Sequence, residues 1–251
     1  MRWKPSLRFA RRLFFALSCV LLTAGLAVAV ALPGPQHLLC PTCQGLDKIA
    51  DKIYVDPVIS VPERKKIAMA LERARGRVAA FFGDLRSSPR IVVCRSRTCA
   101  RAFGTRGAKG VAYAWHAILL TNSRIFTVIA AHELAHIELH WRMGLSGWLR
   151  GTVPAWFDEG LATLISEDPR FKRDAPAAAV RDIMSVQSYL GHWAQYTGRV
   201  GWRAAYGAAR TRVRQLERRI GRDGLRRFVD RLARDGDLAG LLQRVDRGQS
   251  I

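Results

Sequence analysis

The sequence is short of acidic residues. It has 20 Asp and Glu against 41 Lys and Arg in 251 residues, which gives a formal net charge of +21, and most of the cations are arginine. Such a protein is attracted to anionic surfaces, which include phospholipid head groups, nucleic acids and acidic polymers. The sequence also lacks internal repeats and long low-complexity tracts, and 49% of its residues are apolar. This composition excludes a disordered or collagen-like chain and fits one domain of ordinary size with an appendage.

Charged residues are absent from residues 13–32, an apolar run of 20 residues that follows the basic flank 1–12. The run is long enough to span a hydrocarbon core of about 30 Å, whereas the apolar part of a cleavable signal is about 7–15 residues. We therefore expect an uncleaved transmembrane anchor. A signal segment cleaved after Ala27-Val28-Ala29 is the alternative. In both cases the basic flank stays in the cytoplasm and the rest is exported, either membrane-anchored on the periplasmic or extracytoplasmic side or secreted.

Motifs for nucleic-acid recognition are also missing. Basic and aromatic residues do not interleave, and export would remove the usual target, so we expect no nucleic-acid partner. Between Arg199 and Arg234 there are 12 Arg and only three acids. Such a run is usually a solvated helical face, and in a tethered protein it is also able to dock on an anionic membrane surface.

Cysteine is scarce, but four of the five cysteines form two close pairs, Cys40 with Cys43 and Cys94 with Cys99. In an oxidising compartment this pattern predicts two disulfides. A single structural zinc site made by all four thiolates is the main alternative, and free thiols are the other. Bridges between the two clusters would close a loop of about 50 residues and stabilise the domain by about 4 kcal/mol, more than bridges within each cluster. We therefore favour pairing between the clusters.

The exported part begins with a breaker, Pro33-Gly34-Pro35, which opens a linker predicted over residues 33–61. The remainder, 62–251, is predicted to be one domain. A helix at 62–82 is followed by a strand at 90–94 and by a strand-like segment at 111–121 that turns near Trp115-His116. After residue 123 the pattern becomes helical, and the predicted helices cover 124–143, 154–166, 181–196, 201–220 and 223–233. A small sheet followed by a helical half is an α+β arrangement.

The segment His132-Glu133-Leu134-Ala135-His136 contains the strongest indication of function in the sequence. On a helix, histidines at positions i and i+4 project from one face, at the spacing that grips a single Zn²⁺. Glu133, beside the first histidine, is placed to take a proton from an attacking water. Two histidines leave a tetrahedral site short of a third protein ligand, and the longer HExxHxxGxxH pattern fails because position 142 is Arg. A Glu from the next helix is the other common solution, and Glu159 supplies it.

The combination of HELAH with the following Trp156-Phe157-Asp158-Glu159-Gly160-Leu161-Ala162 resembles the gluzincin metallopeptidases, over roughly residues 125–166. The chain is similar to small, membrane-tethered members of that clan with a zincin-like, peptidase MA-like domain. The resemblance implies Zn²⁺ held by His132, His136 and Glu159, with Glu133 as the catalytic base. It implies hydrolysis of peptide bonds in a protein or peptide substrate. The G-A-M-E-N segment of the clan's aminopeptidases is absent, which favours an endopeptidase.

The clan often stabilises the oxyanion with a downstream tyrosine or histidine. Tyr206 begins an Arg-rich helix similar to the one that carries this tyrosine, so it ranks first, ahead of Tyr196, Tyr189 and His192. An aromatic that only packs is the alternative for each of these. Trp115 and His116 precede the metal helix, where by analogy the clan lays substrate along an edge strand.

Two further residues have alternative interpretations. His140 is either a group that supports the metal ligands or a half-exposed histidine at a helix end. Asp158 is either a carboxylate that orients a histidine ligand or an acid of the first helical turn. A zinc-binding scaffold of the same fold without turnover is the alternative function, and an intact Glu133 argues against it.

Overall fold

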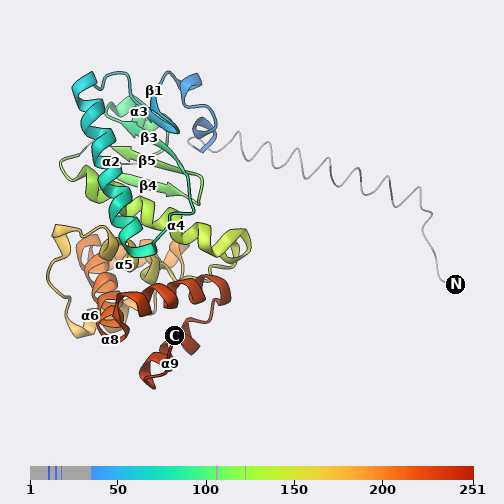
Figure 1. Ribbon diagram of the computed structural model, residues 1–251, viewed down its shortest axis with the longest axis vertical. Coiled ribbons are helices and arrows are strands. Elements are labelled where there is room, and N and C mark those ends of the chain that lie inside the picture. The colour runs from blue at the N-terminus through green and yellow to red at the C-terminus, as the bar shows by residue number, and fades with distance from the viewer. Residues whose placement is uncertain (1–10, 12–14, 16–17, 19–34, 106, 122) are drawn as a thin grey trace.

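The computed structural model describes residues 11, 15, 18, 35–105, 107–121 and 123–251, and it confirms an α+β fold (Figure 1). One five-stranded sheet lies in the N-terminal half, and the rest is mostly helical. The predicted anchor or signal segment, 13–32, falls almost entirely outside the described residues. Among the helices that are described, none is both long and apolar enough to cross a membrane.

The sheet has the strand order β1-β2-β3-β5-β4. Strands β2, β3 and β5 are parallel, while β1 and β4 join the two edges in antiparallel pairs. The strands are β1 (Asp47–Ala50), β2 (Ile53–Val55), β3 (Arg90–Cys94), β4 (Gly110–Tyr113) and β5 (Ala117–Thr121). The strand at 90–94 is confirmed, and the strand-like segment at 111–121 is a hairpin whose turn contains Trp115 and His116.

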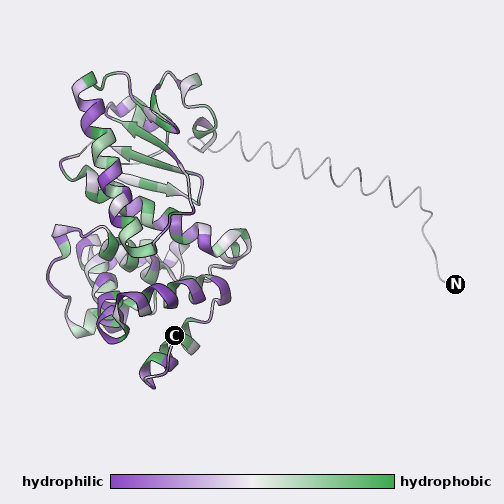
Figure 2. Ribbon diagram, viewed as in Figure 1, coloured by the Kyte–Doolittle hydropathy of each residue, from purple (hydrophilic) through white to green (hydrophobic). Residues whose placement is uncertain are grey.

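Alternate side chains of the central strands enter two separate cores. Ile91 and Val93 of β3 pack into the large core with α2 (Val61–Phe82) and α4 (Phe126–Arg150). Val92 joins a smaller core on the opposite face, together with residues of η1 (Pro35–Leu38) and α3 (Arg97–Ala102). Figure 2 shows the apolar strands between these layers. Because both faces are covered, β3 is a continuous β-branched run rather than an alternating one.

Residues 47–55 lie inside the predicted linker, yet they form β1 and β2. Ile53 and Val55 of β2 are buried and pair with β3, nearly forty residues later in the chain. The turn before β2 places Lys52 at φ 56°, in the left-handed region. Four of the nine residues of this segment are charged, which hides its strand pattern, so the pairing with β3 defines it.

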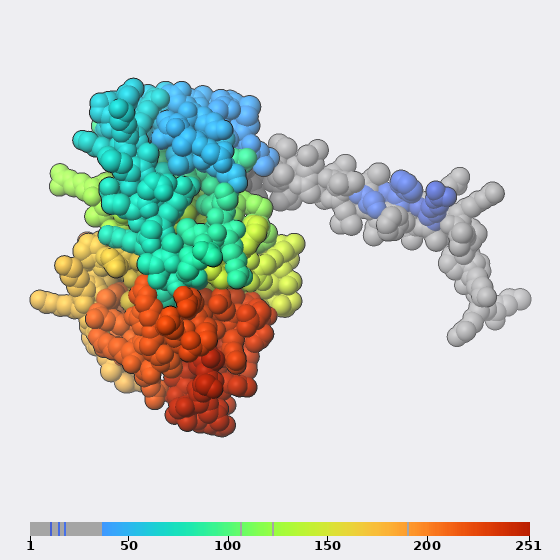
Figure 3. All heavy atoms as spheres, in the orientation of Figure 1, coloured from blue at the N-terminus to red at the C-terminus, as the bar shows by residue number. Residues whose placement is uncertain are grey.

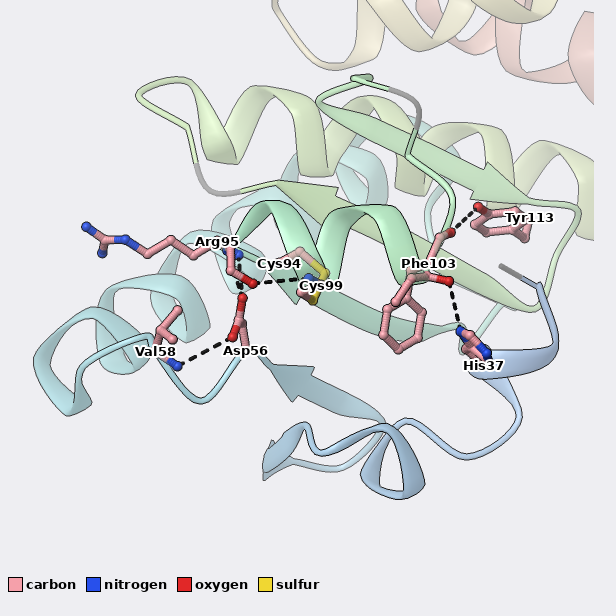
Figure 4. Close-up of a disulfide and its surroundings, with 10 residues drawn as sticks. His37, Asp56, Val58, Cys94, Arg95, Cys99, Phe103 and Tyr113 are labelled. Carbon is pink, nitrogen blue, oxygen red and sulfur yellow. Dashed lines mark hydrogen bonds between the residues drawn. A yellow bond between two sulfur atoms is a disulfide. The ribbon is translucent and has the colours of Figure 1, made fainter. Parts of the chain in front are cut away.

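The two predicted disulfides are confirmed, but the favoured pairing between clusters is wrong. The bonds join Cys40 to Cys43, with a Cα–Cα distance of 5.3 Å, and Cys94 to Cys99, with a Cα–Cα distance of 5.5 Å. Figure 4 shows the second of these bonds. A turn in which Cys43 N–H donates to the Cys40 carbonyl brings the first pair together. Ser96 caps α3 and places Cys99 in its first turn, next to the end of β3. The entropy of loop closure concerns only the unfolded chain. In the folded chain, these local turns decide which sulfur atoms come within bonding distance.

The helical elements follow the predicted pattern with several differences, which include two helices that were not predicted, at 97–102 and 238–246. The helices after α4 are α5 (Ala155–Ile165), α6 (Ala177–Ile183), α7 (Ala194–Val200), α8 (Trp202–Asp235) and α9 (Leu238–Asp246), with shorter turns η2 (Thr42–Gln44), η3 (Pro169–Phe171) and the π-helical η4 (Tyr189–Trp193). The helix predicted at 181–196 is broken, because α6 ends at Ile183 and η4 begins at Tyr189. The helices predicted at 201–220 and 223–233 form one element, α8, kinked where Gly221 has φ 72°. Helix α4 continues seven residues past the predicted end, across a kink at Gly144.

Helix α4 lies between the two halves of the molecule. It packs on α2 and the sheet on one side and on α5 and α8 on the other. Figure 3 shows that the helical half, coloured orange to red, is packed against the sheet half. Groups on α4 therefore lie where the two halves meet.

Candidate metal centre

The three predicted metal ligands are brought together by α4 and α5. His132 and His136 are one turn apart on α4, and their Nε2 atoms are 3.1 Å from each other. Glu159 faces them from α5, with Oε2 at 3.2 Å from His132 Nε2 and 3.4 Å from His136 Nε2. These atoms form a nearly equilateral triangle of a kind that can hold a metal ion.

The size and chemistry of this triangle fit zinc. With bonds of 2.0–2.1 Å, the ligands of a tetrahedral zinc site are about 3.3 Å apart, which is the spacing of the three donor atoms here. Two imidazoles and one carboxylate are also a common protein ligand set for catalytic zinc, which leaves the fourth position for water or substrate. The donor set therefore fits Zn²⁺.

Close packing between α5 and α8 holds Glu159 in place. Gly160 follows it, and a Cβ atom on Gly160 would lie only 2.5 Å from the backbone oxygen of Ala209 in α8. Only glycine allows the two backbones to approach this closely. Pro154 precedes the first residue of α5, and ten of the eleven residues of α5 are buried. The helix is therefore fixed on both faces, and Glu159 points toward α4.

Asp158 holds the histidines in orientation. Its Oδ1 lies 2.5 Å from His136 Nδ1, and its Oδ2 lies 2.8 Å from His140 Nε2 and accepts a 2.7 Å hydrogen bond from the Tyr189 hydroxyl. Burial alone would raise the pKa of Asp158, but His136 and His140 keep it far below its ordinary value. A buried carboxylate on the distal nitrogen of a metal-binding histidine fixes the ring and makes it a better ligand. The structure thus places Asp158 as an orienting group rather than only an acid of the first turn.

His140 is buried rather than half-exposed. Its Nδ1 lies 3.1 Å from the carbonyl oxygen of Ala114 in the β4–β5 turn, while its Nε2 faces Asp158. Ala114 has φ 49°, an unusual value for a residue with a side chain. His140 therefore connects α4 to the hairpin and to α5.

Glu133 lies on the same cavity, beside β4. Its side chain is buried against Gly110, where a Cβ atom would come within 2.5 Å of Glu133 Oε1. Burial raises the pKa of Glu133, although His132 and His136 oppose that shift. A carboxylate with a raised pKa is better suited to accept and return a proton near neutral pH.

Two of the four candidate oxyanion residues lie at the site. The Tyr206 ring is 5.9 Å from the His132 ring, and burial together with the charges of Glu159 and Glu133 keeps the pKa of Tyr206 well above its ordinary value. The Tyr189 side chain is 40% exposed, but its hydroxyl points inward to Asp158. Tyr196 is buried near Asp182, and His192 is exposed. Neither of them lines the cavity.

The cavity has a volume of about 470 Å³ and is lined by Gly110, Val111, Ala112, Ala114, His132, Glu133, His136, His140, Trp148, Glu159, Tyr189 and Tyr206. Three of these residues belong to β4, whose outer edge pairs with no other described strand. The sequence did not single out Gly110, Ala114 or Trp148, because their roles depend on what lies opposite. Trp115 lies in the turn rather than on the strand, with its ring 5.9 Å from that of Trp148.

Comparisons with protein-family models, with curated proteins and with solved structures found no match to this chain. The resemblance to gluzincins rests on the two sequence motifs.

Several arginines on the basic face of α8 form ion pairs with acidic residues. Arg210, Arg214 and Arg218 lie around Asp174, while Arg219 contacts Asp246. This arrangement agrees with a solvated helical face whose charge is partly balanced by neighbouring elements.

Proposed function

We propose that this protein is a zinc-dependent metallopeptidase, and that it acts as an endopeptidase on protein or peptide substrates outside the cytoplasm. One observation supports this most directly. The donor atoms of His132, His136 and Glu159 have the spacing of a tetrahedral zinc site, and the carboxylate of Glu133 lies on the same cavity.

Different residues have different roles in the proposed reaction. His132, His136 and Glu159 would hold Zn²⁺, which would polarise the scissile carbonyl and lower the pKa of a bound water. Glu133 takes the proton of the attacking water and passes it to the leaving nitrogen. Tyr206, with its pKa raised, stays protonated and donates a hydrogen bond to the developing oxyanion. Asp158 keeps His136 in the required orientation.

The outer edge of β4 provides a means of binding a peptide. Gly110, Val111 and Ala112 line the cavity, and β4 is at the edge of the sheet. An extended peptide that adds to this edge would pair its backbone with β4 and carry a scissile bond past the metal ligands.

The proposed location is outside the cytoplasm. Two disulfides among the described residues are typical of an oxidising compartment. The apolar run at 13–32 is the proposed membrane anchor, with a cleaved signal as the alternative.

The decisive experiment compares Glu133→Gln with the wild-type chain in zinc content and in cleavage of unfolded casein. We expect about one zinc per chain in both proteins and a loss of turnover of at least about 100-fold in the variant, because only the base is removed. His132→Ala and Glu159→Ala should lose the metal. His192→Ala, an exposed histidine away from the centre, and Glu72→Gln, an exposed glutamate on α2, are the matched controls.

Several outcomes would contradict the proposal. A Glu133→Gln protein that cleaves casein normally would require another mechanism. Zinc content unchanged in both ligand variants would contradict the ligand assignment. Wild-type protein that binds zinc but cleaves neither casein nor a mixed peptide library would favour the non-hydrolytic scaffold.

A further inference from the structure

The last part of α4 carries several large apolar side chains that are exposed to a substantial degree. Trp141, Leu145, Trp148 and Leu149 are 41–68% exposed. Leu145, Trp148 and Leu149, at positions i, i+3 and i+4, lie on one side of the helical segment that follows Gly144, and Trp141 lies in the turn before Gly144. Soluble surfaces seldom gather two tryptophans and two leucines in this way, and such patches mark sites of association.

The kink at Gly144 separates this segment from the metal-binding part of α4. Gly144 has φ 64° and ψ 176°, so the helix changes direction there. Residues 141–151 contain two arginines and no acid. Arg142 is paired with Glu138 and Asp230, whereas Arg150 at the end of the helix is exposed.

The beginning of the described domain lies against the same face. Leu38 and Leu39 line an apolar cavity together with Trp148, and Leu39 is 77% exposed. The apolar run ends at residue 32, and three residues span at most about 10 Å before Pro35. In Figure 1 the blue segment that begins with η1 and the end of α4 lie on the same side of the molecule. An inserted run at 13–32 would bring this side to the bilayer.

The charge beside this face suits an anionic bilayer. The lining of the cavity that contains Leu39 and Trp148 includes Lys52 and Arg90 but no acid. The basic face of α8 is a weaker candidate for a lipid contact, because acids of neighbouring elements and of α8 itself already pair with several of its arginines. Its hydrophobicity is also low, as its polar colouring in Figure 2 shows.

We propose that Leu39, Trp141, Leu145, Trp148 and Leu149 form a membrane-docking face that lies in the boundary between head groups and acyl chains of an anionic phospholipid bilayer. Tryptophan favours this boundary because its ring is apolar and its N–H is polar, and exposed leucines add buried area. Trp148 also lines the metal cavity, so docking places the mouth of that cavity at the membrane surface. Substrates are then segments of membrane proteins or chains held at the bilayer.

The test uses the full chain in vesicles of phosphatidylglycerol and phosphatidylethanolamine, with a photoreactive benzophenone amino acid at Leu145. The same group at Met69 on α2, which is 54% exposed against 59% for Leu145, is the matched control. We expect lipid adducts on the peptide that contains position 145, at least about 10-fold more abundant than at position 69. The Glu133→Gln protein should give the same adducts, so this test is separate from that of the proposed activity.

A second measurement tests the same face in a protein without the photoreactive group, because that group could itself change lipid binding. Brominated lipids should quench tryptophan fluorescence less in a Trp141→Phe/Trp148→Phe protein than in wild type. Equal adducts at positions 145 and 69, cross-links from 145 to a second copy or another protein, or unchanged quenching in the double variant would each overturn the proposal. Failure of the chain to float with vesicles would do so as well.

Discussion

At the scale of single residues, the centre depends on Asp158 as much as on the ligands. The buried carboxylate of Asp158, on α5, contacts His136 and His140 of α4 and Tyr189 of η4. It thereby fixes the ring of His136, a candidate metal ligand, and is connected to the hairpin through His140.

We predict that Asp158→Asn weakens zinc binding by about 10–100-fold while the fold is kept, because the neutral amide no longer stabilises the oriented histidine. Competition with a chromophoric chelator measures the affinity, and circular dichroism checks the fold. Glu72→Gln on the exposed face of α2 is the control. Unchanged affinity in Asp158→Asn would show that the ligands are held without it.

Asp56 is a second residue whose charge matters. It is buried between the β2–α2 loop and the start of α3, where its carboxylate accepts hydrogen bonds from the backbone N–H groups of Ser96, Arg95 and Val58 (Figure 4). Burial raises the pKa of Asp56, but the interaction with the Ser96 hydroxyl and these backbone hydrogen bonds together outweigh burial, and the pKa is lowered.

Because the pKa of Asp56 is lower in the folded state, the ionised carboxylate stabilises the fold at pH values above the unfolded pKa of about 4. This stabilisation is lost as the pH falls through the pKa of the folded state. We predict that Asp56→Asn lowers the free energy of unfolding by about 1–3 kcal/mol at pH 7 and by less at pH 3. Urea denaturation at both pH values measures the difference. An equal loss at the two pH values would mean that the charge of Asp56 contributes nothing.

At the scale of elements, the close approach of α5 to α8 positions Glu159. The backbone oxygen of Ala209 occupies the space that a side chain at 160 would need. The glycine of the motif at 156–162 is therefore a packing requirement beside a candidate metal ligand rather than a flexible point.

We predict that Gly160→Ala lowers the free energy of unfolding by about 1–3 kcal/mol through overpacking, and that it weakens zinc binding because α5 must shift. Gly76→Ala on α2 is the matched control. A Cβ atom there meets nothing within 4 Å, so this change should stabilise the protein by about 0.5–1 kcal/mol. Thermal denaturation and zinc titration measure both effects. Equal behaviour of the two variants would contradict the packing argument.

At the scale of the whole molecule, the two disulfides reinforce the outer side of the sheet and not the metal centre. Cys94 and Cys99 belong to the small core on the far face, and Cys40 and Cys43 form a turn after η1. Helices α4 and α5, which hold the candidate ligands, contain no cysteine.

We predict that reduction lowers the free energy of unfolding by about 2 kcal/mol for each bond, as expected for short loops, and leaves zinc stoichiometry unchanged. Alkylation mapping should find one peptide pair within each cluster. Urea denaturation with and without a phosphine reductant measures the stability. A peptide that joins Cys40 or Cys43 to Cys94 or Cys99 would contradict the structure, and zinc lost on reduction would show that the two regions are coupled.

The sequence by itself determined the features that depend on local spacing. The i, i+4 histidines on an apolar helix, the helix that presents Glu159 after Pro154 and the strand at 90–94 all follow from periodicity and terminal residues. Local pattern also predicted that two disulfides form, and it separated the sheet from the helical half.

Tertiary structure decided what depends on contacts between distant segments. Strand β2 exists because β3 pairs with it, Asp158 is an orienting group because His140 and Tyr189 converge on it, and Gly110 is required because Glu133 fills the adjacent space. The disulfide pairing follows from which sulfurs the folded backbone brings together, not from loop length. Spacing along the chain fixes only which residues share a face of one element. The partners of that face depend on how the elements pack, since side-chain volume and hydrogen-bond geometry are satisfied only in the folded molecule.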